Sequence, residues 1–198
     1  MKKVTLFATI VLALAMSAAA QQIVDFTQLP HTGSPQAVPV GYAGLRWNAM
    51  YFVDSPIYPD ADLYIGANGA INSGRGFFTG NEAMVAFGGG SMCYKNYGAP
   101  VQDGHTDVHV CESSISAWQN ALFQIDSAVV ADGWDTSGDF ITVTAFRNGV
   151  QVGPSFRYNL STTAQRLDFS HNNWGQITEL VIHPSPGGSF VMYTLQVR

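Results

Sequence analysis

The 198-residue chain has few charged residues, few cysteines and no long stretch of helical periodicity. Charged side chains make up 12% of the sequence, against about 25% in an ordinary soluble domain, whereas hydrophobic residues make up 46%. This balance excludes a disordered segment, a coiled coil and a basic nucleic-acid-binding protein. A chain of this length can bury a core of its own, so we expect one domain.

No hydrophobic run is long enough to span a bilayer, which takes about 20 apolar residues. The longest run, residues 4–16, follows two lysines and precedes the small residues 17–20. This is the pattern of a secretory signal peptide. We therefore expect residues 1–20 to be removed and a single exported β-sandwich domain, residues 21–198, to remain outside the cell without membrane insertion.

Basic residues are scarce, and those of the expected mature chain are scattered singly. Without the first twenty residues, seven basic and fourteen acidic residues remain, which gives a formal charge of −7. Such a chain repels the phosphates of nucleic acids and anionic lipids. We therefore expect a neutral partner, such as carbohydrate or another cell-surface or matrix component, or a cation.

Only two cysteines occur, Cys93 and Cys111. In an oxidising compartment two cysteines most often pair, so we expect a disulfide. Two free thiols or a thiolate metal ligand are the alternatives, although the spacing is unlike the short cysteine pairs of zinc sites. The one N-glycosylation sequon begins at Asn159 and has meaning only in a eukaryotic source.

Short apolar runs separated by Gly, Pro, Asn and Asp predict an all-β protein. Residues 66–80 are expected to be irregular, and the glycines at 88–90 to end a strand. Asn148-Gly149 predicts a two-residue hairpin, since both central residues of a type I′ turn need positive φ. Regularly spaced turns predict an antiparallel two-sheet sandwich, most simply a jelly roll. The strands are expected over residues 23–26, 45–53, 83–87, 121–131, 140–146, 150–160, 166–169, 179–183 and 190–197.

Three stretches carry a resemblance to a known kind of domain. They are GYAGLRWN at residues 41–48, FQIDSAVVADGW at 123–134 and GSFVM at 188–192. In this order they resemble a secreted β-sandwich domain of bacteria and fungi, of the kind found in exosortase-sorted (PEP-CTERM) proteins. The resemblance covers about residues 25–197. It implies a jelly-roll or galactose-binding-like sandwich and no established activity.

The chain departs from that pattern in three ways. No hydrophobic sorting tail follows Arg198, so anchoring by that route is not expected. Tyr193 and Thr194 follow Met192 where such domains commonly close with Met-Asp-Asn or Met-Asp-Asp. A calcium site built on that carboxylate is therefore in doubt here. The insertion between the two cysteines is peculiar to this chain.

Asp and His alternate between residues 103 and 109, and this is the sharpest local pattern. If the segment is a strand, His105, Asp107 and His109 share one face, with successive residues of that face about 7 Å apart. These three could hold a transition metal with a further ligand from elsewhere. A solvated strand face is the interpretation that we prefer. An acidic loop with Asp54, Asp60 and Asp62 could likewise hold calcium. We prefer the interpretation of an ordinary loop, because Asp and Pro are turn residues in their own right.

Trp174 lies in a polar turn, Ser170-His171-Asn172-Asn173-Trp174-Gly175, where a large aromatic side chain is as readily exposed as buried. An exposed ring would stack on a sugar, and His171, Asn172 and Asn173 would supply hydrogen bonds beside it. Trp47 and Trp134 are interpreted as core residues, since Trp47 lies in a strand with apolar neighbours and Trp134 follows an alternating strand.

The sequence contains no nucleophile elbow and no phosphate-binding glycine loop before a helix. We therefore predict a secreted, non-catalytic module, without a cofactor, that binds carbohydrate or a cell-surface component through loops at one end of the sandwich. One alternative is a structural or host-interaction protein without a small ligand. A metal-dependent secreted enzyme is the other.

Overall fold

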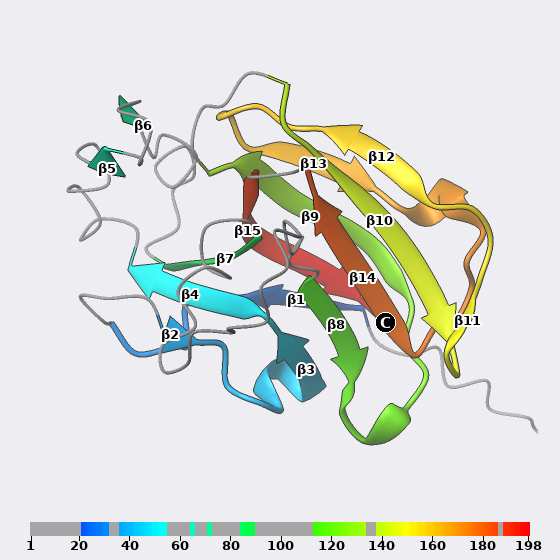
Figure 1. Cartoon of the computed structure of the whole chain (residues 1–198). Helices are drawn as coiled ribbons and strands as arrows, with labels where there is room; N and C mark the ends of the chain where they lie inside the picture. Colours follow the sequence, from blue (N-terminus) through cyan, green and yellow to red (C-terminus); the bar gives the residue numbers. More distant parts are fainter. Residues whose placement is uncertain are drawn as a thin grey trace, which may run out of the picture.

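The computed structural model describes residues 21–31, 36–54, 64–65, 71–72, 84–89, 113–133, 138–185 and 188–198. Within these ranges the regular elements are β-strands and single turns of 3-10 helix. They form an antiparallel two-sheet sandwich, so the predicted all-β fold class is confirmed (Figure 1). Over the same ranges, no helix has the length and apolar character needed to cross a membrane.

Two large sheets form the sandwich, and the sheet that holds β10 and β14 passes in front of the other in Figure 1. We call the larger one sheet A and the smaller one sheet B. Sheet A holds β1 (Gln22–Asp25), β2 (Gln36–Ala37), β4 (Met50–Asp54), β7 (Met84–Gly89), β9 (Ile125–Asp132), β13 (Gln165–Asp168) and β15 (Ser189–Val197). Sheet B holds β3 (Leu45–Asn48), β8 (Ser113–Ala117), β10 (Phe140–Arg147), β11 (Val150–Gln151), β12 (Phe156–Asn159) and β14 (Glu179–Pro184). A separate pair joins β5 (Tyr64–Ile65) to β6 (Ile71–Asn72).

The chain crosses between the sheets as two long antiparallel ribbons. In the first, β3 pairs with β8 in sheet B and β4 pairs with β7 in sheet A. In the second, β10 pairs with β14 and β9 pairs with β15. The ribbons join through β8 with β14 and β7 with β15. Ribbons rolled across two sheets in this way are the arrangement of a jelly roll.

The segment predicted as one strand over residues 45–53 is two strands in different sheets. Ala49 separates β3 from β4 and has a φ of 50°. This left-handed value turns the chain, so Trp47 of sheet B and Phe52 of sheet A both reach the core. Trp47 packs edge-on against Phe26, with 5.5 Å between ring centroids, and its indole N–H donates to the Tyr42 carbonyl at 3.0 Å. The core placement of Trp47 is confirmed.

Sheet B follows the two-residue period that the sequence predicts. Along β10 and β14, buried and half-buried residues alternate, so one face enters the core and the other meets solvent. The predicted turn is also confirmed, because Asn148 and Gly149 have φ values of 51° and 78° between β10 and β11. The returning strand, expected over residues 150–160, is divided into β11 and β12.

Sheet A differs because part of it is apolar on both faces. Val53, Ala131, Val191 and Tyr193 form a second buried group, which we call the outer cluster, separate from the core between the sheets. Tyr193 is 1% exposed. It is also the extra residue in a β-bulge, since Met192 pairs with Val130 and Thr194 with Val129. The tyrosine that departs from the resembled pattern therefore has a packing role.

Gly88 lies within β7, although the glycines at 88–90 were expected to end the strand. It pairs with Met50 on one side and Phe190 on the other. A Cβ atom built at Gly88 would lie 2.3 Å from the Ser113 hydroxyl and 2.9 Å from the Phe190 ring. Glycine is required here because sheet B and the Phe190 ring approach the backbone closely.

Candidate ligand-binding end of the sandwich

A hollow of about 240 Å³ lies where the chain leaves η6 (Ser170–Asn172) and approaches β14. The start of β9 closes its other side. We call it the end pocket. Its lining residues are Gln124, Ile125, Phe169, Ser170, Asn173, Trp174, Gly175 and Ile177.

The end pocket has an apolar floor and an uncharged polar rim. Ile125, Phe169, Trp174 and Ile177 are buried members of the core. The other four lining residues are exposed or half-buried and offer amide, hydroxyl and backbone groups. None of the eight lining residues carries a charge. The pocket therefore suits a neutral ligand with one apolar face and several hydrogen-bonding groups.

Trp174 is buried, which corrects the expectation of an exposed stacking ring. The residue is 5% exposed. Its ring lies 5.6 Å from the Phe156 ring and 5.9 Å from the Phe169 ring, between centroids. The indole N–H donates to the Pro154 carbonyl at 3.3 Å. Because aromatic neighbours and the chain at Pro154 cover the ring, Trp174 supports the pocket floor and offers no open face to a sugar.

The other three predicted ligand-binding residues separate into different environments. Asn172 is buried, and its amide donates to the Tyr158 hydroxyl at 3.2 Å, so it holds the turn in place. The His171 side chain is 89% exposed and lies 3.8 Å from Asp168; it does not line the pocket. Asn173 lines the pocket, with a φ of 55° that asparagine tolerates well. Of the predicted set, only Asn173 and Trp174 therefore belong to the pocket.

Ser170 connects the pocket rim to an exposed carboxylate on β13. Hydrogen bonds from the Ser170 hydroxyl and then from its backbone amide lower the pKa of Asp168 below its ordinary value. The hydrogen bond from the Ser170 backbone N–H to the Asp168 carboxylate is 2.9 Å long. These bonds fix the start of η6, because the carboxylate accepts from the residue two positions later.

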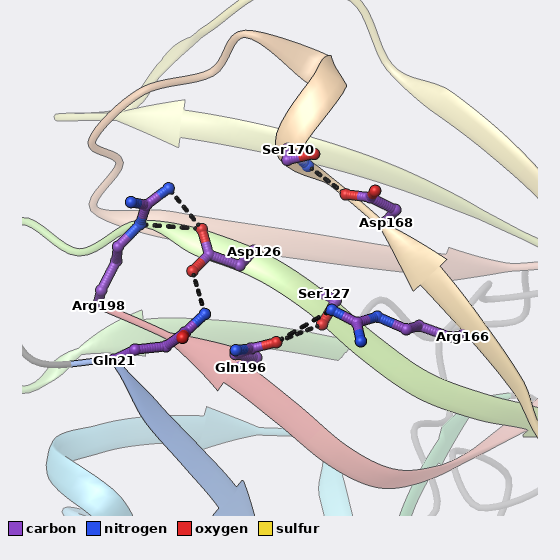
Figure 2. A network of polar contacts seen from close by, with 8 residues as sticks. All are labelled: Gln21, Asp126, Ser127, Arg166, Asp168, Ser170, Gln196 and Arg198. Carbon is purple, nitrogen blue, oxygen red and sulfur yellow. Dashed lines mark hydrogen bonds and ion pairs between the residues drawn. The ribbon is translucent and has the colours of Figure 1, made fainter.

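Behind the pocket, a polar network joins both ends of the described chain to β9 (Figure 2). The Arg198 guanidinium donates to one oxygen of Asp126, at 3.0 Å from Nε and 2.9 Å from Nη2. Gln21 donates to the other oxygen at 3.1 Å. Asp126 has a side chain only 11% exposed, so this pairing compensates a nearly buried charge. The network positions the strand end that carries Gln124 and Ile125, and no pattern in the sequence predicts it.

A neighbouring set of contacts lies on the outer side of sheet A. Gln196 accepts hydrogen bonds from the Ser127 hydroxyl at 2.9 Å and from Arg166 at 3.3 Å, as Figure 2 shows. Ser127 and Gln196 are direct cross-strand partners in β9 and β15. These contacts secure β13 against β9 and β15 next to the pocket.

Several predicted features lie outside the described residues. They are the signal peptide, Cys93 and Cys111, the candidate ligands His105, Asp107 and His109, Trp134, and the acidic loop beyond Asp54. Within the described ranges, no three His, Cys, Asp or Glu residues gather closely enough to hold a metal ion. Asn159 is exposed at the end of β12. Its glycosylation stays a prediction.

No family model matches this chain, and no curated protein matches it in sequence. A solved DUF4465 family protein from Bacteroides ovatus matches it in fold with a TM-score of 0.47 and 7% identity, over 90% of this chain and 94% of that chain. TmCBM61, solved in complex with β-1,4-galactotriose, matches with a TM-score of 0.33 and 9% identity, over 82% of this chain and 98% of that chain. Neither likeness is close enough to carry a ligand or an activity over to this chain.

Proposed function

We propose that this chain is an exported, non-catalytic carbohydrate-binding module that holds one neutral sugar residue in the end pocket. The observation that carries this proposal is the combination of an apolar floor with an uncharged rim of amide and hydroxyl groups. A pyranose ring presents the matching chemistry, because its C–H faces are apolar and its hydroxyls both donate and accept hydrogen bonds.

The size and charge of the site support a small neutral ligand. At about 240 Å³, the end pocket is smaller than the roughly 300–1,000 Å³ of sites for drug-sized ligands. It therefore suits a single sugar residue or the end of a chain. The formal charge of −7 expected for residues 21–198 would repel polyanions and leave neutral polysaccharides as the favoured targets.

The buried carboxylate next to the pocket has a structural role. Asp126 follows the lining residue Ile125, but its two oxygens accept from Arg198 and Gln21. A general acid or base needs a proton that it can exchange with the substrate. Asp126 is instead committed to holding the chain ends together.

A glycan array and pull-down on insoluble polysaccharides, with protein from expression of the full chain, would test the proposal. The informative variant combines Gln124→Ala with Asn173→Gly, since glycine keeps the positive φ at position 173. Two lost hydrogen bonds, each worth roughly 0.5–1.5 kcal/mol, should together weaken binding by roughly 5-fold to 150-fold.

Gln28→Ala is the matched control, because Gln28 is exposed and lies outside the end pocket. This variant should bind as the wild type does. If no glycan binds the wild type, the proposal is wrong, and the alternative of a host-interaction protein without a small ligand gains support. Binding that ignores the double substitution would place the sugar at another surface.

A further inference from the structure

A second hollow lies beside the end pocket, on the outer side of sheet B. It has a volume of about 410 Å³ and lies where the β10–β11 hairpin, η5 (Trp118–Asn120) and the start of β14 come together, at the lower right of Figure 1. We call it the Glu179 pocket. Its side chains come mainly from Arg46, Ser116, Asn120, Asn148, Thr178 and Glu179.

The base of the Glu179 pocket is a row of directly opposed residues. Ser116 pairs with Arg46 on one side and with Glu179 on the other. The guanidinium and the carboxylate therefore arise from strands two spacings apart, about 9.5 Å between backbones. The serine between them is small and leaves space above it. A ligand that enters this space meets hydrogen-bond donors on one side and acceptors on the other.

Glu179 supplies the pocket with an accessible carboxylate. It is half-buried, yet within the part of the chain that the structure describes no hydrogen bond or ion pair engages its carboxylate. An ionised carboxylate only accepts hydrogen bonds and has two oxygens for them. Adjacent hydroxyls of a sugar are suitable donors, because together they can reach both oxygens. The hydroxyl of the neighbouring Thr178 already has two hydrogen bonds: it accepts from the Asn148 backbone N–H and donates to the Phe146 carbonyl.

The rim of this pocket includes a tight turn. Gln119 and Asn120 have φ values of 64° and 58°, both left-handed. Asparagine tolerates this conformation well, and the turn sets Asn120 at the edge of the hollow. The Asn120 amide therefore lies where it can contact a ligand in the hollow.

The two pockets are lined by consecutive parts of one chain segment. Asn173, Trp174, Gly175 and Ile177 contribute to the end pocket, whereas Thr178 and Glu179 line the second pocket. We call the segment 175–178, with the Arg147 side chain against it, the Arg147 ridge. Phe123 and Ile177 hold the ridge through paired backbone hydrogen bonds of 3.0 and 2.8 Å. Arg147 lies along it, because its guanidinium donates to the Gln176 carbonyl and approaches Gly175, while the next residue, Asn148, lines the second pocket.

We propose that the Glu179 pocket is a second sugar subsite, and that a neutral oligosaccharide occupies both pockets across the Arg147 ridge. This inference rests on the proposed function of the end pocket and extends its ligand from one sugar residue to a chain. Glu179 accepts hydrogen bonds from hydroxyls of the second residue, and Arg46 and the amides at the rim donate to its oxygens. Two linked subsites make affinity depend on chain length, since the second contact becomes intramolecular.

Isothermal titration calorimetry with protein from the full chain would measure this dependence. The probes are neutral β-1,4-linked gluco-, galacto- and xylo-oligosaccharides of one to five units. For the series that binds, affinity should rise at least tenfold from the monosaccharide to the longer members. Glu179→Gln, which keeps the shape and removes the charge, and Ser116→Leu, which fills the base of the hollow, should each remove most of that rise. Both variants should bind the monosaccharide as the wild type does.

Asp25→Asn is the matched control, since it also removes one negative charge but lies on β1 of sheet A. It should keep the full dependence on chain length. Equal affinity for short and long probes in the wild type would overturn the second subsite and leave the proposed function standing. Variants that lose the monosaccharide as well would also overturn it, because both pockets would then form one site. If none of the three series binds, the proposed function fails too.

Discussion

The outer faces of the two sheets have opposite character. On sheet B, half-buried residues such as Thr144, Glu179 and Val181 alternate regularly with core residues and meet solvent. On sheet A, Val191 and Tyr193 point away from the main core and are nevertheless buried in the outer cluster. A strand buried on both sides has no side chains left for a ligand. The strands of sheet A that carry the outer cluster therefore support the fold, while the outer face of sheet B and the start of β9 with η6 offer accessible groups.

The largest effect that would test this contrast comes from a matched pair of aromatic truncations. Tyr193→Ala should destabilise the fold by about 3–5 kcal/mol, as truncation of a buried aromatic does. Phe146→Ala, on the half-buried outer side of sheet B, should cost clearly less. Since 1 kcal/mol shifts the Tm of a domain of this size by about 2–4 °C, scanning calorimetry would separate the two variants.

Equal losses of Tm in Tyr193→Ala and Phe146→Ala would contradict the difference in packing between the outer faces of the two sheets. They would mean either that the outer face of sheet B is packed as firmly as the outer cluster, or that Tyr193 contributes little where it lies.

A smaller difference in stability is expected from the same substitution at two valines, one on the outer face of each sheet. Val191 is buried in the outer cluster of sheet A, and Val181 is half-buried on the outer face of sheet B. Val191→Thr buries a hydroxyl, which costs about 1–3 kcal/mol when no partner compensates it. Val181→Thr should lie within about 0.5 kcal/mol of the wild type, as surface substitutions usually do. Urea denaturation measures both, and a Val191→Thr variant as stable as Val181→Thr would contradict the outer cluster.

The smallest expected effect concerns the exposed carboxylate beside the end pocket. Hydrogen bonds from Ser170 lower the pKa of Asp168 in the folded state. The resulting stabilisation is therefore present above the unfolded carboxyl pKa of 3.8 and is lost as the pH falls through the lower folded value. Denaturation of the wild type and Asp168→Asn over this range should show a small difference that disappears in acid.

A stability difference between these two proteins that grows as the pH falls would contradict this sign. A large difference at neutral pH would also be unexpected, since the carboxylate is exposed and solvent screens its interactions.

The sequence predicts those parts of the fold that depend on local pattern. Alternation identifies β10 and β14, because one face of sheet B is buried and the other is not. Asn148-Gly149 identifies the hairpin, because few residue pairs accept two positive φ values. The break at Ala49 was missed, since alanine in a left-handed conformation has no signature in its residue type. The strand β8 was missed as well, since its serines lack the strand-forming side chains that mark the others.

The candidate site was only partly predictable, because it depends on contacts between distant segments. The polar turn around Trp174 was found, but the burial of its ring follows from Phe156 and Pro154, some twenty residues earlier. The role of Gln124 depends on η6 lying beside the start of β9. Likewise, Arg46, Ser116 and Glu179 come from three separated strands, and only their register brings them into one row.

The pairing of the first and last strands has a mechanical consequence. Gln22 lies opposite Val197, and beyond them Gln21 and Arg198 both reach Asp126. Tension between the two ends would therefore load the hydrogen bonds of β1 and β15 one after another, as in an opening zipper, and strands loaded in this way separate at lower force than strands pulled past one another. The Arg198–Asp126 ion pair and the Gln21 hydrogen bond would carry the first of that load. Tension applied at only one of these two segments would leave both contacts unloaded.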